Sequence, residues 1–99
     1  MTKLISLSKS TRPEKKYEVK LLGNSGREIT IHFGAAGMLD YTLTPVAERE
    51  ERKLRYLARH KATEDWTNPE TAGFWSRWIL WNLPTVSASL QYVKKRFFL

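Results

Sequence analysis

Two alternating segments and the turn between them decide the fold: Tyr17-Glu18-Val19-Lys20-Leu21, then Gly23-Asn24-Ser25-Gly26, then Glu28-Ile29-Thr30-Ile31-His32-Phe33. Apolar and polar residues alternate in the outer segments, which is typical of β-strands with one buried face. The Gly/Asn segment has the composition of a tight turn. The pattern predicts an antiparallel β-hairpin whose apolar face consists of Tyr17, Val19, Leu21, Ile29, Ile31 and Phe33.

Helices must cover that face, because a two-stranded hairpin alone is only marginally stable. Thr44-Pro45 and Asn68-Pro69 each combine a helix-capping residue with proline, which favours the first position of a helix. Thr85 can cap a further helix after Pro84. The sequence therefore predicts an α+β fold, a single small domain over residues 14–99 with an N-terminal β-hairpin followed by three helices, at about 45–62, 69–81 and 85–97.

The composition excludes several classes of site. The 99 residues include no cysteine, which rules out disulfides, thiolate zinc sites and cysteine nucleophiles. No apolar run approaches the roughly 20 residues that a transmembrane helix needs. The start of the chain is too weakly apolar for a secretory signal, so we expect a protein that is not secreted. A formal net charge of +7 favours polyanionic partners.

The first 13 residues contain three basic residues and no acidic one, and they are rich in serine and threonine. We interpret residues 1–13 as a flexible basic arm. An ordinary frayed terminus is the alternative, and Leu4, Ile5 and Leu7 offer a third possibility, in which the segment docks on a neighbouring protein.

The helix expected at 45–62 has two different faces. Helical spacing places Ala47, Leu54, Leu57 and Ala58 on an apolar side that we expect to face the core. The nearly opposite side suits phosphate binding, because guanidinium groups fork onto phosphates and a tyrosine can stack on a base. Its members are Arg49, Arg52, Lys53, Tyr56, Arg59 and His60, with Lys94, Lys95 and Arg96 near the C-terminus as helpers. The alternatives are a solvated helix face and, for the C-terminal cations, a complement to the helix dipole.

The helix expected at 69–81 is apolar on nearly every side. Such a helix is normally buried, although a domain of this size has limited room to bury it fully. Either it forms the core, or part of it is an interface with another protein. The candidate interface residues are Phe74, Trp75, Trp78 and Trp81.

No enzymatic signature is present. His32 and His60 do not lie at the spacing of metal ligands, and Asp40 and Asp65 are far apart in the sequence. We therefore expect a protein that is not an enzyme, with no catalytic residue, no metal, no cofactor and no small-molecule substrate.

Several segments together resemble a family of short uncharacterised proteins encoded by large double-stranded DNA viruses and some phages. The resemblance covers roughly residues 15–98. It is carried by His32-Phe33-Gly34-Ala35-Ala36-Gly37, Asp40-Tyr41-Thr42, Arg55-Tyr56-Leu57-Ala58-Arg59-His60, Trp66 and Pro69-Glu70-Thr71-Ala72-Gly73-Phe74-Trp75-Ser76-Arg77-Trp78-Ile79-Leu80-Trp81. The stretch from Thr44 to Glu51 departs from the family pattern through Glu48, Glu50 and Glu51, which weakens phosphate binding at that end. The resemblance implies a viral setting, in the virion or in the cytoplasm or nucleus of the infected cell, and supplies no activity.

These observations favour a minor structural component of a virion, whose partners are other virion proteins or further copies of itself. The aromatic helix is the reason to place this hypothesis first. The second hypothesis is a nucleic-acid-binding accessory protein that binds phosphates through the basic helix face, with DNA as the candidate partner. The third is a virus-encoded adaptor or inhibitor of a host protein.

Overall fold

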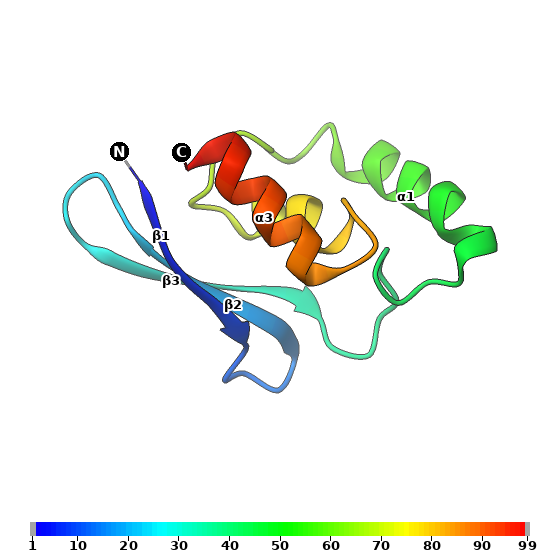
Figure 1. Cartoon of the computed structure of the whole chain (residues 1–99), viewed down its shortest axis with the longest axis horizontal. Coiled ribbons are helices and arrows are strands. Elements are labelled where there is room, and N and C mark those ends of the chain that lie inside the picture. The colour runs from blue at the N-terminus through cyan, green and yellow to red at the C-terminus, as the bar shows by residue number, and fades with distance from the viewer. Residues whose placement is uncertain (1, 99) are drawn as a thin grey trace.

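A three-stranded antiparallel sheet precedes the helices in the computed structural model, which describes residues 2–98 (Figure 1). The strands follow the order β1-β2-β3 in the sheet and span Lys3–Lys9, Lys15–Leu22 and Glu28–Ala35. The helical elements are α1 (Val46–His60), α2 (Ala72–Trp75), the π-helix η1 (Ser76–Leu80) and α3 (Val86–Phe97). Figure 1 shows α2, η1 and α3 between the sheet and α1, which forms the opposite end of the molecule.

The prediction of an N-terminal β-hairpin is wrong, because a third strand extends the sheet. Strand β1 runs antiparallel to β2 and lies within residues 1–13, the segment interpreted as a flexible basic arm. A bulge between Leu4 and Ser6 shifts the register of β1. The extra residue lets Leu4 and Leu7 both pack against the core, although they are three positions apart, and it leaves Ile5 exposed.

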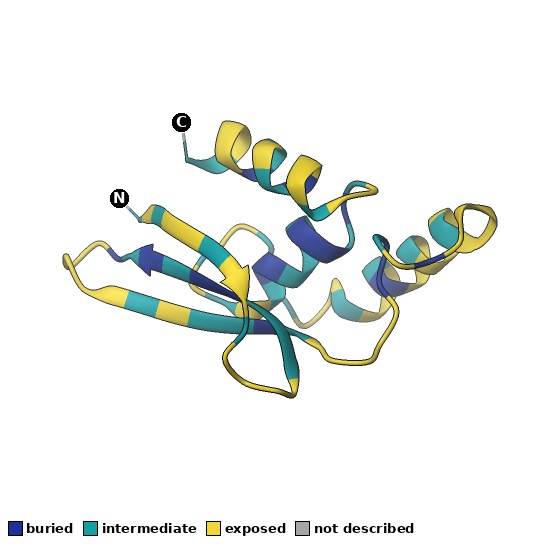
Figure 2. Cartoon of the chain, turned by 60° about the horizontal axis from the view of Figure 1, so that its bottom comes forward, coloured by how far each residue is buried: buried dark blue, intermediate teal, exposed yellow. Residues whose placement is uncertain are grey.

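Strands β2 and β3 pair as their alternation predicts. Tyr17 lies opposite Phe33, Val19 opposite Ile31, and Leu21 opposite Ile29. Val19, Leu21 and Phe33 are fully buried, and the other three residues of this face pack against the same cluster. Figure 2 shows these buried positions on the two strands.

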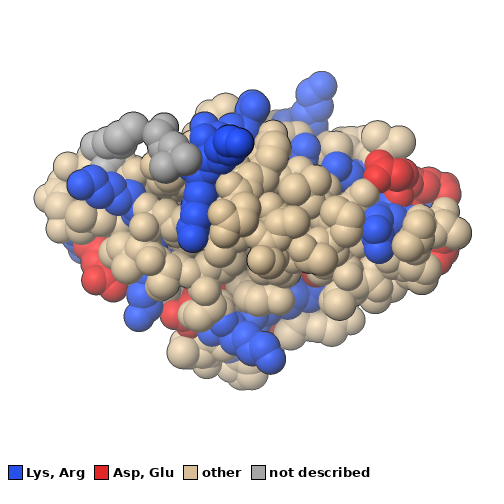
Figure 3. Space-filling view, viewed as in Figure 1, with Lys and Arg blue, Asp and Glu red and all other residues tan. Residues whose placement is uncertain are grey.

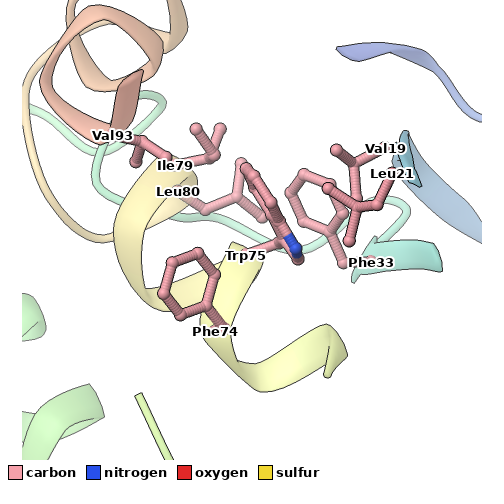
Figure 4. Close-up of a cluster of buried hydrophobic side chains, with 8 residues drawn as sticks. All are labelled: Val19, Leu21, Phe33, Phe74, Trp75, Ile79, Leu80 and Val93. Carbon is pink, nitrogen blue, oxygen red and sulfur yellow. The ribbon is translucent and has the colours of Figure 1, made fainter. Parts of the chain in front are cut away.

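The core forms where α2, η1 and α3 meet the sheet. Phe74, Trp75, Ile79, Leu80 and Val93 pack there against the three buried sheet residues (Figure 4). The Trp75 ring lies between Phe33 and Phe74, with its centroid 6.4 Å from the first and 5.1 Å from the second. Its indole N–H donates a 2.7 Å hydrogen bond to the Pro69 carbonyl, so the buried polar atom is satisfied. The aromatic segment therefore forms the core of the domain.

The prediction of a continuous α-helix at 69–81 is wrong in two places. Residues before Thr71 form turns, and Asn68 accepts a 3.0 Å hydrogen bond from the Glu70 N–H, as in an Asx turn. Helix α2 begins only after Thr71, whose hydroxyl accepts from the Phe74 N–H at 3.3 Å. From Ser76 the backbone then widens into a π-helix.

The other two helices lie close to their predicted ranges. Thr44 was expected to cap α1, but its hydroxyl donates instead to the Asp40 carbonyl at 2.6 Å, and Pro45 occupies the cap position. Thr85 caps α3 as predicted by accepting a 3.1 Å hydrogen bond from the Ala88 N–H. Within residues 2–98, no helix has the length and apolar character needed to cross a membrane.

Candidate nucleic-acid interface

Helix α1 faces the rest of the molecule with the side that was predicted to be exposed. Ala47, Leu54 and Ala58 are exposed, and Leu57 is only partly covered. The inward side instead carries Arg49, Lys53, Tyr56 and His60, which are buried or half-buried. The prediction that the apolar side of this helix faces the core is therefore wrong.

Tyr56 anchors the inward side through aromatic stacking. Its ring is 6% exposed and stacks on Trp81, with centroids 4.7 Å apart and planes inclined by 7°. The His60 ring stacks on Tyr56 at 4.4 Å. Burial raises the pKa of Tyr56, so its hydroxyl stays neutral in the physiological range. A ring enclosed in this way is part of the scaffold, and it cannot be the base-stacking group that the sequence suggested.

Arg49 and Lys53 are also anchors. The Arg49 guanidinium lies 5.2 Å and the Lys53 ammonium 5.0 Å from the centroid of the Tyr41 ring. Lys53 donates a 3.0 Å hydrogen bond to the Asn82 carbonyl. Burial lowers the pKa of Lys53, and nearby Arg77 lowers it further. Their stems and charges stabilise the contact between α1 and the turn that follows β3.

The outward basic residues of α1 line a hollow. Arg52, Arg55 and Arg59 follow one another at spacings of three and four, which places them on one side of the helix. They enclose a space of about 360 Å³ together with Gly37, Met38, Leu39 and Trp81. Arg52 and Arg59 were predicted site residues, whereas Arg55 was not. Arg55 pairs with Glu51 on the same helix, but both side chains are about two-thirds exposed, so that pair holds the arginine only weakly.

A second hollow of about 350 Å³ continues the first toward the sheet. Both are lined by Met38, Leu39, Arg59 and Trp81, and the second extends to the ends of β2 and β3, where Lys15 and Lys16 stand. We call the two connected hollows the α1 groove.

The two acidic residues in the α1 groove already have partners. Asp40 is 2.5 Å from the Lys16 ammonium, and the two side chains are 3% and 12% exposed. Glu64 lies 2.9 Å from His60 Nδ1 and accepts a 3.0 Å hydrogen bond from the Trp66 indole. Among the described residues, five basic side chains line the groove, which are Lys15, Lys16 and the three arginines of α1, against these two carboxylates, so the groove has a surplus of positive charge.

A glycine-containing loop forms the wall opposite α1. Gly34 has a φ of +79°, and a Cβ atom there would lie 2.7 Å from Leu80 Cδ1, so the backbone approaches η1 closely. Gly37 has a φ of +83° and faces open space. Asp40 fixes the end of this loop, because its carboxylate accepts from the Thr42 N–H at 2.8 Å. The Tyr41 N–H donates to the Leu80 carbonyl at 2.9 Å, which ties the loop to η1.

A comparison with known protein families identifies the family of this chain. The model of a family of unknown function (DUF5754) matches residues 5–60, more than half of the chain. The chain belongs to this family. The matched residues include β2, β3 and most of β1, the loop from Gly34 to Asp40 and α1, while Trp81 lies outside them. Neither the curated proteins nor the solved structures contain a match to the chain.

The structure does not bring the C-terminal cations to the groove. Lys94, Lys95 and Arg96 are exposed in the last turns of α3, at the end of that helix away from α1 (Figure 1). Arg96 lies over the Trp78 ring, 5.6 Å from its centroid. Figure 3 shows basic side chains spread over the face of the molecule that is in view, and acidic side chains on the outer part of α1. The predicted nucleic-acid residues thus belong to two separate regions.

The candidate protein-interface residues also lie in different environments. Phe74 and Trp75 have no exposed surface, so both belong to the core. Trp78 is half-buried, with the Arg77 guanidinium 4.2 Å from one ring centroid and Tyr92 stacked at 5.8 Å. Its indole N–H donates to the Trp66 carbonyl at 2.9 Å. Trp81 differs from the others because its partly exposed ring lines the α1 groove.

One cluster outside the groove has the residue types of a hydrolase triad. Ser10 Oγ lies 2.7 Å and Glu18 Oε1 3.8 Å from the same atom, His32 Nδ1. A triad requires the hydroxyl and the carboxylate on opposite ring nitrogens, so this geometry does not relay a proton. The Thr11 N–H donates to Glu18 at 2.8 Å and lowers the pKa of that carboxyl. These hydrogen bonds stabilise the connection between β1 and β2.

The side chains that could bind a metal ion do not gather at one place in the described residues. Over residues 2–98, no group of three histidine, aspartate or glutamate side chains converges in a way that would hold a metal ion.

Proposed function

We propose that the protein binds nucleic acid, with the sugar-phosphate backbone lying in the α1 groove. The observation that carries this proposal is the arginine row Arg52, Arg55 and Arg59. Among the described residues, these three arginines are the charged residues that line the first hollow, and no acidic residue lines it. A polyanion is the natural partner for three guanidinium groups on one wall of a hollow.

The spacing of the row suits a phosphate backbone. Arg52 and Arg59 are seven residues apart, which at 1.5 Å per residue separates them by about 10 Å along the helix axis. Long, exposed arginine side chains at that separation reach successive phosphates of one strand. Phosphate contacts of this kind position a protein without reading sequence, so we expect weak sequence preference.

The exposed state of the row also supports the proposal. Arg49, Lys53, Tyr56 and His60 make the inward contacts of α1, whereas the three arginines of the row are exposed, so we expect their substitution to leave the fold intact. The groove is formed by backbone that is itself fixed, through Gly34 at η1 and Asp40 at the loop end. Because the backbone of the groove is fixed, the loss of conformational freedom on binding is confined to the side chains.

Fluorescence anisotropy with a labelled oligonucleotide tests the proposal. The variant R52Q/R55Q/R59Q removes the row, and K94Q/K95Q/R96Q is its matched control because it removes the same formal charge from α3. We expect wild type and control to bind at about 50 mM salt, and the row variant to bind at least about tenfold more weakly. Equal losses in the two variants would show that only the net charge matters, and the groove would then not be the site.

We propose a second candidate, a packing contact with another protein, in line with the minor virion component that the viral resemblance suggests. Exposed apolar side chains around α1 favour it: Leu43 is 58%, Val46 77% and Leu54 65% exposed. Mass spectrometry of purified particles tests this role, and absence of the protein from mature particles would contradict it. Recovery with host proteins after a pull-down, lost in an L54E variant, would support an adaptor role instead.

A further inference from the structure

We infer that the α1 groove takes a single strand, and that Trp81 is the platform on which one unpaired base stacks. This inference rests on the proposed function and adds to it the form of the nucleic acid. Trp81 is partly exposed and lines both hollows, so it stands where they join. Arg59 lines both hollows as well, so a basic residue also borders their junction.

The Trp81 ring is held before any ligand arrives. Tyr56 covers one ring face in a nearly parallel stack, and His60 stacks on Tyr56 in turn. The Trp81 backbone is fixed at both polar groups: its N–H donates to the Ser76 carbonyl at 3.1 Å, and its carbonyl accepts from Arg77 at 2.8 Å. A base on Trp81 would become the fourth member of a stack whose other three rings already exist.

The opposite wall of the groove suits a base. Met38 and Leu39 line both hollows and are 63% and 48% exposed. A tryptophan and exposed apolar side chains in the lining of one cationic groove combine the two requirements of single-strand binding, which are an aromatic stacking surface and a positive path for the backbone. Bases in a duplex are already stacked on their neighbours and present only their edges, so Trp81 would gain little from double-stranded DNA.

Three ligands of about 20 nucleotides test the inference by anisotropy: oligothymidine, a duplex, and an abasic oligomer with the same phosphates and no bases. We expect wild type to bind oligothymidine about five- to 140-fold more tightly than the abasic oligomer, the range that one stacked base provides. W81L should bring the ratio of the two affinities close to one. The row variant R52Q/R55Q/R59Q should weaken both ligands.

A second measurement keeps the test independent of the folding of W81L. W81F retains a ring that can pack on Tyr56, and it removes one of the four tryptophan fluorophores. We expect unlabelled oligothymidine to quench the fluorescence of wild type and to leave W81F nearly unquenched, while the abasic oligomer quenches neither.

Failure of the base-stacking inference and failure of the proposed function would give different results. Equal affinity for oligothymidine and the abasic oligomer, tighter binding of the duplex, or equal quenching in W81F would overturn the base-stacking inference and leave the proposed function standing. If wild type binds none of the three ligands at about 50 mM salt, the proposed function fails together with the inference.

Discussion

Substituting Asp40 by asparagine removes one charge from the ion pair that closes the loop before α1. Asp40 is 3% and Lys16 12% exposed, and their charged atoms are 2.5 Å apart. Asparagine has nearly the same shape, and its side-chain oxygen still accepts from the Thr42 N–H. D40N therefore leaves the turn intact and leaves the Lys16 ammonium with the Met38 carbonyl as its remaining acceptor.

The expected cost follows from this partial compensation. Removing one partner of a buried ion pair typically costs about 3–5 kcal/mol. Lys16 keeps one acceptor and some solvent contact, so we expect the lower end, about 3 kcal/mol in the free energy of unfolding. For a domain of this size, that corresponds to a fall in Tm of roughly 12–24 °C.

Urea and thermal unfolding followed by circular dichroism measure the effect. The control is K16M/D40N, which removes both charges and keeps the aliphatic stem, and it should recover most of the stability lost in D40N. A fall in Tm of less than about 4 °C in D40N would refute the reasoning. A double variant no more stable than D40N would also refute it, since the loss would then not come from the unpaired lysine.

Three further predictions concern the stability of the fold. G34A should destabilise the protein by about 2–4 kcal/mol in urea unfolding, because the alanine must adopt a positive φ and its Cβ meets Leu80. G37A carries only the first penalty, since its Cβ faces open space, so it should cost about 1–2 kcal/mol, and equal losses would contradict the close approach at Gly34. The Glu18 carboxyl has a pKa lowered from 4.5, chiefly by the Thr11 N–H, so its contribution to stability is present above that value and is lost as the pH falls through the folded-state pKa. Unfolding free energies of E18Q should therefore fall less steeply than those of wild type below about pH 4.5, and parallel curves would argue against the hydrogen bond. L54A should change stability by no more than about 0.5 kcal/mol, whereas L80A should cost about 2–5 kcal/mol; a large loss in L54A would mean that α1 faces the core with its apolar side.

The sheet shows what alternation predicts and where it fails. The pairing of β2 with β3 was predictable because every second residue from Tyr17 to Leu21 is apolar and a turn follows at the right distance. Strand β1 was missed because Leu4 and Leu7 are three residues apart, which matches no strand with period two. The bulge that places both on the core face depends on pairing with β2, and a single segment does not reveal it.

The orientation of α1 was mispredicted for a different physical reason. A helical wheel treats arginine and lysine as solvent-facing, but their long aliphatic stems bury well against aromatic rings. Tyr41 and Trp81 supply those rings from two distant parts of the chain, and Arg49, Lys53 and Tyr56 pack on them. The apolar side of α1, with Leu54, is left exposed as a result.

The candidate site was only partly predictable. Arg52 and Arg59 were found from helical spacing, and Arg55 could have been found from the same row at three- and four-residue intervals. Trp81 was expected at a protein interface, and its place in the groove depends on the loop from Gly34 to Asp40. That arrangement is a property of the tertiary structure, which brings η1 beside α1.

Chemical-shift mapping tests the central claim most directly, because it reports both whether nucleic acid binds and where. The protein labelled with ¹⁵N is titrated with oligothymidine at about 50 mM salt, where phosphate contacts are strong. We predict that the largest shifts fall on the backbone amides of residues 37–39 and 52–59 and on the Trp81 indole, with small changes at residues 94–96. Shifts concentrated at residues 94–96, or none in the groove at saturating oligonucleotide, would contradict the assignment of the α1 groove as the binding site.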